Sequence, residues 1–243
     1  MDNLVFVHGY LGGAAQWNAQ VNFLKQDYRV FCLDLPGYGA RSDEVAPDSI
    51  TAFAEFCLSE LTALGCEKFH LVGHSMGGMV VQEMIRLAPE RVNRLMLYGT
   101  GPVGLLPGRF EPIEESKRRV KEDGAEVSAR RISATWFLAR EESAQYPVCE
   151  ALAIKSSMQA MLAGLTAMET WSGVDALPSI KSPTLVLWGD GDRTYPWSQA
   201  EHLWHEIEGA RLAVIPGCAH AVHLEQTEIF NAILEQFLKV EAQ

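Results

Sequence analysis

The sequence lacks any hydrophobic run long enough to cross a membrane. A transmembrane helix needs about 18 or more consecutive apolar residues, and no stretch of the 243 residues reaches that length. The N-terminal residues Met1-Asp2-Asn3-Leu4 contain no lysine or arginine, so they do not have the basic start of a secretory signal peptide. We therefore expect a cytoplasmic protein without a membrane partner.

Cysteine is sparse and forms no pattern. The five cysteines are odd in number, lie far apart and include no C-x-x-C motif. Reduced thiols in a cytosolic protein are the simplest explanation for this usage. His202 and His205 stand three residues apart but have no acidic or thiol partner in the pattern, so the sequence predicts no metal site.

Positive charge is also scarce. The chain has 20 lysines and arginines against 31 aspartates and glutamates, which gives a net charge of −11. A nucleic-acid-binding domain requires a basic face, so we expect no nucleic-acid partner. Of the whole chain, 48% of the residues are hydrophobic and 21% are charged. This composition favours one large α/β domain, alone or with an insertion.

What is present is organised around a strand, a turn and a helix near residue 75. The apolar run 69–72 predicts a buried strand, and the next five residues, Gly73-His74-Ser75-Met76-Gly77, fit G-x-S-x-G. Apolar residues then recur at helical spacing up to Pro89. We expect Ser75 on a sharp turn with its hydroxyl exposed and a helix N-terminus directed at it, because a Cβ at Gly73 or Gly77 would crowd that turn.

Strands and helices alternate along the chain except in one long segment. The alternation predicts a parallel sheet with right-handed crossovers. From Val103 to about Asp175 only helical patterns are found. An insertion at the carboxyl end of a strand lies over the ligand crevice, so we expect residues 103–175 to form a helical cap between two parts of the core, 1–102 and 176–243. The predicted strands are 4–7, 28–33, 69–72, 94–98, 184–188 and 210–215.

Candidate partners for a serine nucleophile follow two later strands. Such a serine needs a base, and the base needs a group that orients it. Asp190 and Asp192 follow strand 184–188, whereas His220 and His223 follow strand 210–215. Carboxyl ends of parallel strands meet at one edge of the sheet, so these residues can converge on Ser75. The spacing alone leaves either aspartate and either histidine open.

These motifs resemble those of the α/β-hydrolase fold. The resemblance spans residues 4 to about 237, leaves the cap unmatched, and is strongest to 3-oxoadipate enol-lactonases and small carboxylesterases; carrier-protein methyl-ester esterases are more distant. It implies a mostly parallel sheet with helices on both faces and an inserted helical cap. The sequence departs from the family pattern in one respect, since the two usual leading strands are expected to be missing or shortened. The matching stretches are His8–Gly12, Asp34–Gly39, Gly73–Gly78, Trp188–Pro196 and Gly217–Glu225.

The resemblance also implies a role for individual residues. The nucleophile would be Ser75, the acid Asp192, three residues after the glycine that ends its strand, and the base His220, which closes the G-x-x-H turn. The backbone N–H groups of Tyr10 and Met76 would meet the oxyanion. Chemistry of this kind needs no metal or organic cofactor.

The expected activity is that of a serine hydrolase. It would cleave a carboxylic ester or lactone of a small, partly apolar substrate through an acyl-enzyme on Ser75. Because a fold does not fix function, the alternatives are a C–C bond hydrolase, lyase or acyl transferase with the same triad, a carrier-protein methyl-ester esterase, or a ligand-binding protein without catalysis. The basic run Lys117-Arg118-Arg119 offers a docking face for an acidic carrier, although such a run is more often a solvated helix face.

The cap should line the substrate pocket. Trp136 and Phe137 are adjacent, so on one helix their side chains point about 100° apart and at most one faces the pocket. Met158, Met161 and Leu162 share a helix face and should limit the size of the acyl or alcohol group. His74 is expected beside the pocket, packed against the nucleophile turn.

Overall fold

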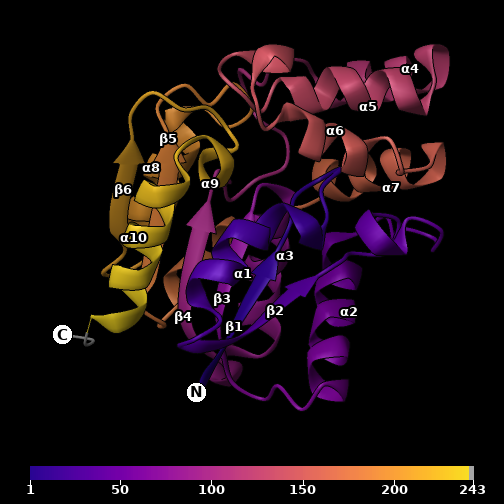
Figure 1. Cartoon of the computed structure of the whole chain (residues 1–243). Helices are drawn as coiled ribbons and strands as arrows, with labels where there is room; N and C mark the ends of the chain where they lie inside the picture. The colour runs from indigo at the N-terminus through magenta and orange to yellow at the C-terminus, as the bar shows by residue number, and fades with distance from the viewer. Residues whose placement is uncertain (241–243) are drawn as a thin grey trace.

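The structure, a computed structural model, describes residues 1–240 and contains a six-stranded sheet with helices on both faces (Figure 1). All neighbouring strands are parallel, in the order β2-β1-β3-β4-β5-β6. The order reverses between β1 and β3, and ligands of open α/β sheets bind at such a reversal. The strands are β1 (Asp2–Val7), β2 (Tyr28–Leu33), β3 (Phe69–His74), β4 (Val92–Tyr98), β5 (Thr184–Gly189) and β6 (Arg211–Ile215).

Alternate strand residues belong to two different cores. In β1, Val5 and Val7 pack in the core that contains α2, α3 and α8, whereas Leu4 and Phe6 pack in the core that contains α1 and α10. This period of two is expected for a strand that is covered on both faces, and it explains why β1 reads as a continuous apolar run. The covering helices are α1 (Asn18–Leu24), α2 (Ile50–Ala63), α3 (Met76–Leu87), α8 (Trp197–Glu206) and α10 (Thr227–Lys239).

The register brings the carboxyl ends of the strands to one level. Val7, the last residue of β1, pairs with Gly73 of β3, and Gly189 at the end of β5 pairs with Ile215 at the end of β6. The loops that follow these four strands therefore start side by side at the same edge of the sheet. These are the loops that carry the sequence-predicted site residues.

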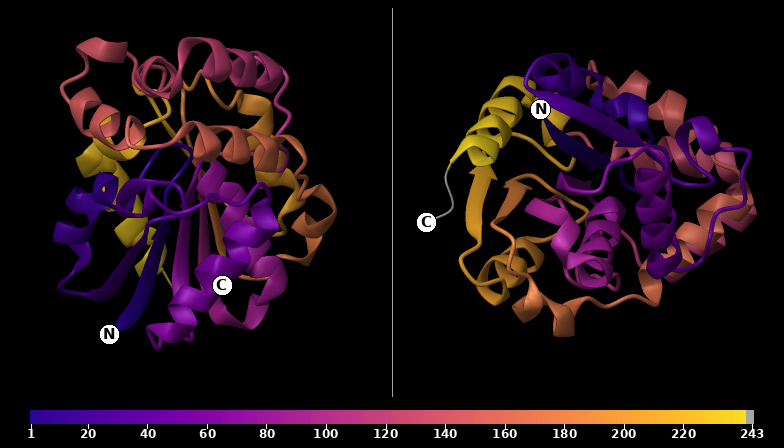
Figure 2. Two further views of the ribbon diagram at one scale, coloured as in Figure 1. Left: turned by 90° about the vertical axis from the view of Figure 1, so that its right-hand side faces the viewer. Right: turned by 90° about the horizontal axis from the view of Figure 1, so that it is seen from below.

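The segment between β4 and β5 forms a helical cap over that edge (Figure 2). Its only β-structure among the described residues is an isolated bridge between Val103 and Ser172. Gly173 N donates to Pro102 O at 2.8 Å, so the two ends of the cap leave the core side by side. The cap helices are α4 (Ile113–Asp123), α5 (Ala125–Ala134), α6 (Tyr146–Ala153) and α7 (Met158–Glu169).

Helix α7 attaches the cap to the core. The hydroxyl of Tyr10 donates to Met161 O at 3.1 Å, and that of Tyr38 donates to Ala160 O at 2.9 Å. A Cβ at Gly164 would lie 2.1 Å from the Tyr38 hydroxyl oxygen, so glycine is required for this close approach. The first half of α7 therefore packs against the core and holds the cap in place.

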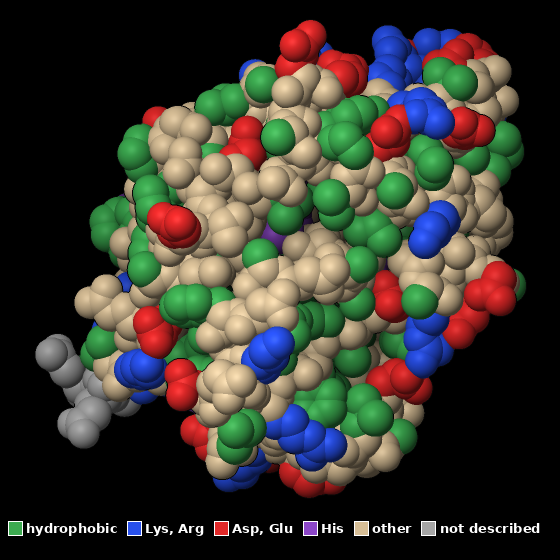
Figure 3. Space-filling model, in the orientation of Figure 1, with side chains coloured by type: hydrophobic (Ala, Val, Ile, Leu, Met, Phe, Trp, Pro, Cys, Tyr) green, Lys and Arg blue, Asp and Glu red, His purple; other side chains and the backbone are tan. Residues whose placement is uncertain are grey.

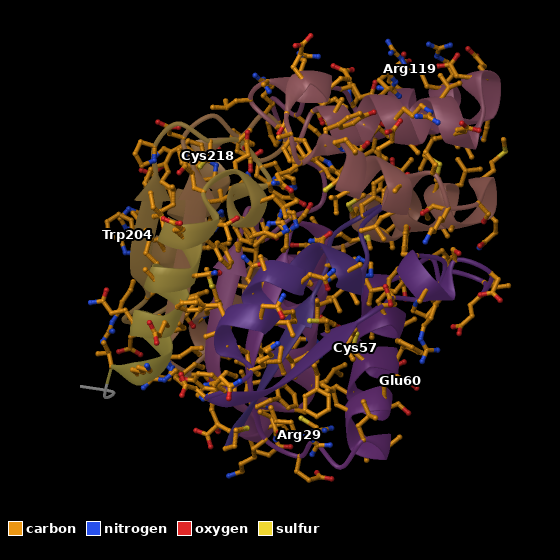
Figure 4. All side chains as sticks on the ribbon, viewed as in Figure 1. Arg29, Cys57, Glu60, Arg119, Trp204 and Cys218 are labelled. Carbon is orange, nitrogen blue, oxygen red and sulfur yellow. The ribbon has the colours of Figure 1, made fainter. Side chains whose placement is uncertain are left out.

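All five cysteines are free, and Cys57 on α2 lies far from Cys218, which follows β6 (Figure 4). Over residues 1–240, no helix is both long and apolar enough to span a membrane. Strand β1 begins at Asp2 and lies between β2 and β3, so that β2 forms one edge of the sheet.

Candidate active site

Ser75 occupies a strained turn between β3 and α3. Its backbone angles are φ 57° and ψ −124°, in a region that residues other than glycine rarely adopt. A Cβ at Gly73 would lie 2.4 Å from Val81 Cγ2, and one at Gly77 would lie 2.4 Å from His8 O. The prediction that side chains at these two positions would crowd the turn is confirmed.

Strand β4 and the loop that follows it hold the backbone of Ser75. The Ser75 N–H donates to Tyr98 O at 3.0 Å, and the Thr100 hydroxyl donates to Ser75 O at 2.8 Å. The loop after β1 passes directly over the side chain, since a Cβ at Gly9 would lie 2.7 Å from the Ser75 Cβ. These contacts offset the backbone strain and fix the hydroxyl at the carboxyl edge of the sheet.

Asp192 and His220 form a buried hydrogen-bonded pair. Asp192 Oδ2 lies 2.8 Å from His220 Nδ1, and both side chains are at most 1% exposed. The other carboxylate oxygen, Oδ1, accepts the N–H groups of Thr194 at 2.7 Å and Tyr195 at 3.0 Å. A carboxylate only accepts hydrogen bonds, so Nδ1 carries the proton and Nε2 of the neutral ring is left able to accept one.

The other aspartate and histidine that the sequence left open have different partners. Asp190 is exposed, and its Oδ1 accepts the Gly217 N–H at 2.9 Å. His223 Nδ1 lies 3.0 Å from the Tyr98 hydroxyl, and its ring packs 4.4 Å from that of Trp17. The carboxylate–imidazole contact at this edge of the sheet is therefore the one between Asp192 and His220.

His74 holds the backbone carbonyl of His220. His74 Nε2 donates to His220 O at 3.1 Å, and the Tyr98 hydroxyl donates to the same oxygen at 2.8 Å. Burial, and then the neighbouring His220 and His223, hold the pKa of His74 well below its ordinary value. His74 is thus neutral with its proton on Nε2, and Nδ1 accepts from Gln16 Nε2 at 3.4 Å.

His223 should make the fold sensitive to acid. Burial, and then the nearby His220, lower the pKa of His223 to about 3. As pH falls below the unfolded-state pKa of about 6.5, the unfolded chain takes up a proton first, so stability is lost progressively between about 6.5 and 3. We expect a loss on the order of 3 kcal/mol by pH 4.5. Urea unfolding at pH 7 and 4.5 should show a smaller loss in His223→Asn; an unchanged loss would exclude this role.

Ser75 lies between two small hollows beneath the cap. Ser75 and His220 share the first hollow. Its other lining residues are Gly9, Tyr10, Gln16, His74 and Trp136. The second, here named the inner cavity, has a volume of about 20 Å³, the room of roughly one water molecule. A histidine side chain is visible through a hollow in the middle of the face drawn in Figure 3. The inner cavity is lined by Tyr10, Ser75, Gly104, Leu106, Arg109, Phe110, Ile113, Ile132, Trp136, Met168, Thr194 and Tyr195.

The structure corrects four of the expected pocket residues. His74 and Trp136 reach the hollows beside Ser75, but Phe137, Met158, Met161 and Leu162 line neither. Phe137 packs edge-on against the Tyr146 ring, and the side chain of Met158 is on the surface, 40% exposed. Met161 lies in the docking half of α7, and Leu162 packs against the main core. Trp136 and Phe137 follow α5 in a turn and a bend rather than standing on one helix, and of the two only Trp136 lines the hollows.

Three residues that line the inner cavity differ in how far the sequence indicates their place. Met168 stands seven residues after Met161, which is about two helical turns on the same face, so the periodicity contained that signal. Tyr195 follows Asp192 by three residues, and its ring stacks on His220 with centroids 5.6 Å apart. Arg109 lies in the irregular segment before α4, where no periodicity exists to show which side chains turn inward.

The expected oxyanion donors, Tyr10 and Met76, flank the serine. Tyr10 lines both hollows with Ser75, and within residues 1–240 its N–H has no hydrogen-bond partner. Met76 is the first residue of α3, and the N–H groups of a first helical turn have no partner within the helix. Both amides are available to an anion formed at the serine.

The profile of the Alpha/beta hydrolase family matches residues 4–233. The chain belongs to this family. It is 31% identical, over 98% of its length and 87% of the relative's, to a 2-hydroxy-6-oxononadienedioate/2-hydroxy-6-oxononatrienedioate hydrolase of Paraburkholderia phymatum. Two solved structures share its fold: the enol-lactonase of Burkholderia xenovorans (20% identity, TM-score 0.88, 99% of this chain and 93% of that one) and an esterase of Thermogutta terrifontis (24%, 0.86, 98% and 90%).

Membership in this family establishes a hydrolase on the α/β scaffold and leaves open which bond is cleaved. The similar proteins named above include a dienedioate hydrolase, an enol-lactonase and an esterase. No group of three or more histidine, cysteine or acidic side chains that could hold a metal ion occurs in the described part of this hydrolase.

Proposed function

We propose that this hydrolase cleaves a carboxylic ester or lactone of a small, partly apolar substrate through an acyl-enzyme on Ser75. The observation that carries the proposal is the buried hydrogen bond between Asp192 and His220 at a hollow that His220 shares with the strained Ser75. A nucleophile, a base and an orienting carboxylate in this relation are the requirements of acyl transfer through serine.

In the proposed mechanism Ser75 Oγ attacks the carbonyl carbon while His220 Nε2 takes its proton. Asp192 holds the imidazole in the Nδ1-protonated tautomer and stabilises the imidazolium. The N–H groups of Tyr10 and Met76 bind the oxyanion, and one such donor typically contributes about 10²–10³ in rate. His220 then protonates the leaving group, and water activated by the same histidine releases the acyl group.

A C–C bond hydrolase is the second candidate, and the name of the Paraburkholderia phymatum relative favours it. The same triad can act on an activated ketone or be diverted to lyase or acyl-transfer chemistry. A panel of p-nitrophenyl esters, aliphatic lactones and vinylogous 1,5-diketo acids, assayed with wild type and Ser75→Ala, separates these. Serine-dependent turnover of esters or lactones at least tenfold above that of the diketo acids supports the proposal; the reverse order supports the second candidate.

The basic run on α4 gives little support to a carrier-protein esterase. Lys117 pairs with Glu169 at 2.5 Å, and Arg118 and Arg119 each pair with Glu115 at 2.7 Å. Acidic and basic side chains accordingly alternate over the outer end of the cap in Figure 3, and Arg119 lies at that end in Figure 4. A run whose cations already have glutamate partners is a solvated, ion-paired helix face.

Met168 should limit substrate size, in place of the residues first expected. It lines the inner cavity from α7 and is 6% exposed. Met168→Ala removes most of a flexible side chain beside Ser75, so kcat/KM across acetate, butyrate, hexanoate and octanoate esters should shift toward longer chains, with acetate changed by less than about tenfold. The control is Met158→Ala on the outer surface of the same helix. An identical chain-length profile in both variants would show that Met168 is only part of the cap core.

A further inference from the structure

Arg109 stands at the entrance to the inner cavity. A second hollow, here named the outer groove, has a volume of about 350 Å³ on the solvent side of the segment before α4. The outer groove and the inner cavity share Leu106, Arg109 and Ile113 as lining residues. The inner cavity alone has room for about one water molecule, so a substrate that reaches Ser75 from this side must extend past Arg109.

The guanidinium of Arg109 has unused donors. Nη1 donates to Glu111 O at 2.8 Å and to the Ser116 hydroxyl at 3.1 Å, which fixes the group in place. Nε and Nη2 have no hydrogen-bond partner within residues 1–240. The guanidinium carbon Cζ lies over the Phe110 ring, 4.4 Å from the ring centroid. The contacts that fix the guanidinium of Arg109 therefore leave its Nε and Nη2 donors unused.

Arg109 also has no carboxylate partner in the described chain. The nearby Glu111 accepts the Ser116 hydroxyl at 2.5 Å with Oε1 and Arg131 Nη1 at 2.9 Å with Oε2. The other polar side chains that line the cavity are uncharged: the hydroxyls of Ser75 and Thr194, and the phenols of Tyr10 and Tyr195, whose pKa values burial raises. One positive charge at the cavity wall remains uncompensated, and a partly buried charge without a partner is costly.

We propose that Arg109 binds a carboxylate of the substrate, so that this site acts on esters or lactones that carry a free carboxylate a few bonds from the reacting carbonyl. The inference rests on the function proposed above. The planar, permanently charged fork of an arginine suits bidentate binding of a carboxylate. The part of the substrate between the carboxylate and the reacting carbonyl would lie against the apolar side chains of Leu106, Phe110 and Ile113.

The first test compares substrates that differ in one charge. Wild type should hydrolyse monomethyl glutarate with a kcat/KM about 10- to 100-fold above that for methyl pentanoate, which is the size of effect expected for hydrogen bonds to a charged group. Arg109→Gln should abolish this preference, so that the ratio of kcat/KM for the two esters falls to within about threefold of one. The matched control is Arg118→Gln, which removes one positive charge from the outer cap and should keep the preference. Equal rates for the two esters in wild type would overturn the proposal.

The second test separates the subsite from the chemistry. Calorimetry with Ser75→Ala should detect glutarate but not the neutral glutaramide, and Ser75→Ala/Arg109→Gln should lose at least tenfold in glutarate affinity. If ester turnover is absent but this loss is found, the proposed function fails and the carboxylate site stands. If p-nitrophenyl acetate is hydrolysed but glutarate binds both variants equally, the function stands and the carboxylate site is overturned. Arg109→Lys, which keeps the charge and a donor toward Glu111 O, should bind glutarate between these limits if Arg109→Gln does not fold.

Discussion

Ser75→Ala is expected to fold normally and to lose ester hydrolysis by about 10⁴-fold or more, the size of effect found when a serine nucleophile acting with a histidine is removed. The substitution deletes one oxygen at a position whose backbone donates a hydrogen bond to Tyr98 O and accepts one from the Thr100 hydroxyl, and neither bond involves that oxygen. Steady-state turnover of p-nitrophenyl acetate, with the thermal midpoint as a check on folding, measures both expectations.

A matched control for this substitution exists in the cap. Ser128 is a buried serine of α5 whose hydroxyl has no partner within the described residues. Ser128→Ala removes the same atom elsewhere and should leave turnover within about twofold. Turnover near the wild-type level in folded Ser75→Ala would rule out a serine mechanism.

Asp192→Asn should lower kcat by about 10⁴-fold, because the amide would present the wrong group to His220. The N–H groups of Thr194 and Tyr195 both donate to Oδ1, so the amide oxygen must take that place. The NH₂ group would then face His220 Nδ1, which must accept, and the ring proton moves to Nε2. A histidine protonated at Nε2 cannot take the proton of Ser75.

The control for this variant is Asp190→Asn. Asp190 is exposed and caps the Gly217 N–H, so its substitution should change kcat by less than about threefold. Measurement of kcat for both variants over a range of pH distinguishes a tautomer effect from a change in folding. A steep loss in Asp190→Asn with a small loss in Asp192→Asn would reverse the assignment.

The fold and the meeting of Ser75, Asp192 and His220 at one edge of the sheet were accessible from sequence because their signals are local. Strand β2 has the predicted bounds, and the other strands differ by at most a few residues, since buried parallel strands read as short apolar runs that end in glycine or proline. The turn at Ser75 requires glycine at positions 73 and 77 for steric reasons, and that requirement is visible in the sequence. The cap was predicted from the loss of strand signals after Tyr98.

The pocket was less accessible because periodicity shows which helix face is buried and not what covers it. The face of α7 that carries Met161 was identified correctly as apolar, but its first half docks on Tyr10 and only Met168 reaches the cavity. Arg109 was missed because its place depends on a segment without regular structure. Only the structure shows that the carboxylate of Glu111 is paired with Arg131 rather than with Arg109.

The most direct test of the account is covalent labelling with a fluorophosphonate followed by mass spectrometry of the digested protein. The probe reacts with a serine only when that serine is activated by a base. The account predicts one label, on the peptide that contains Ser75, and its absence in Ser75→Ala and strong reduction in Asp192→Asn. An unlabelled wild-type protein, or a label on a different serine, would contradict it.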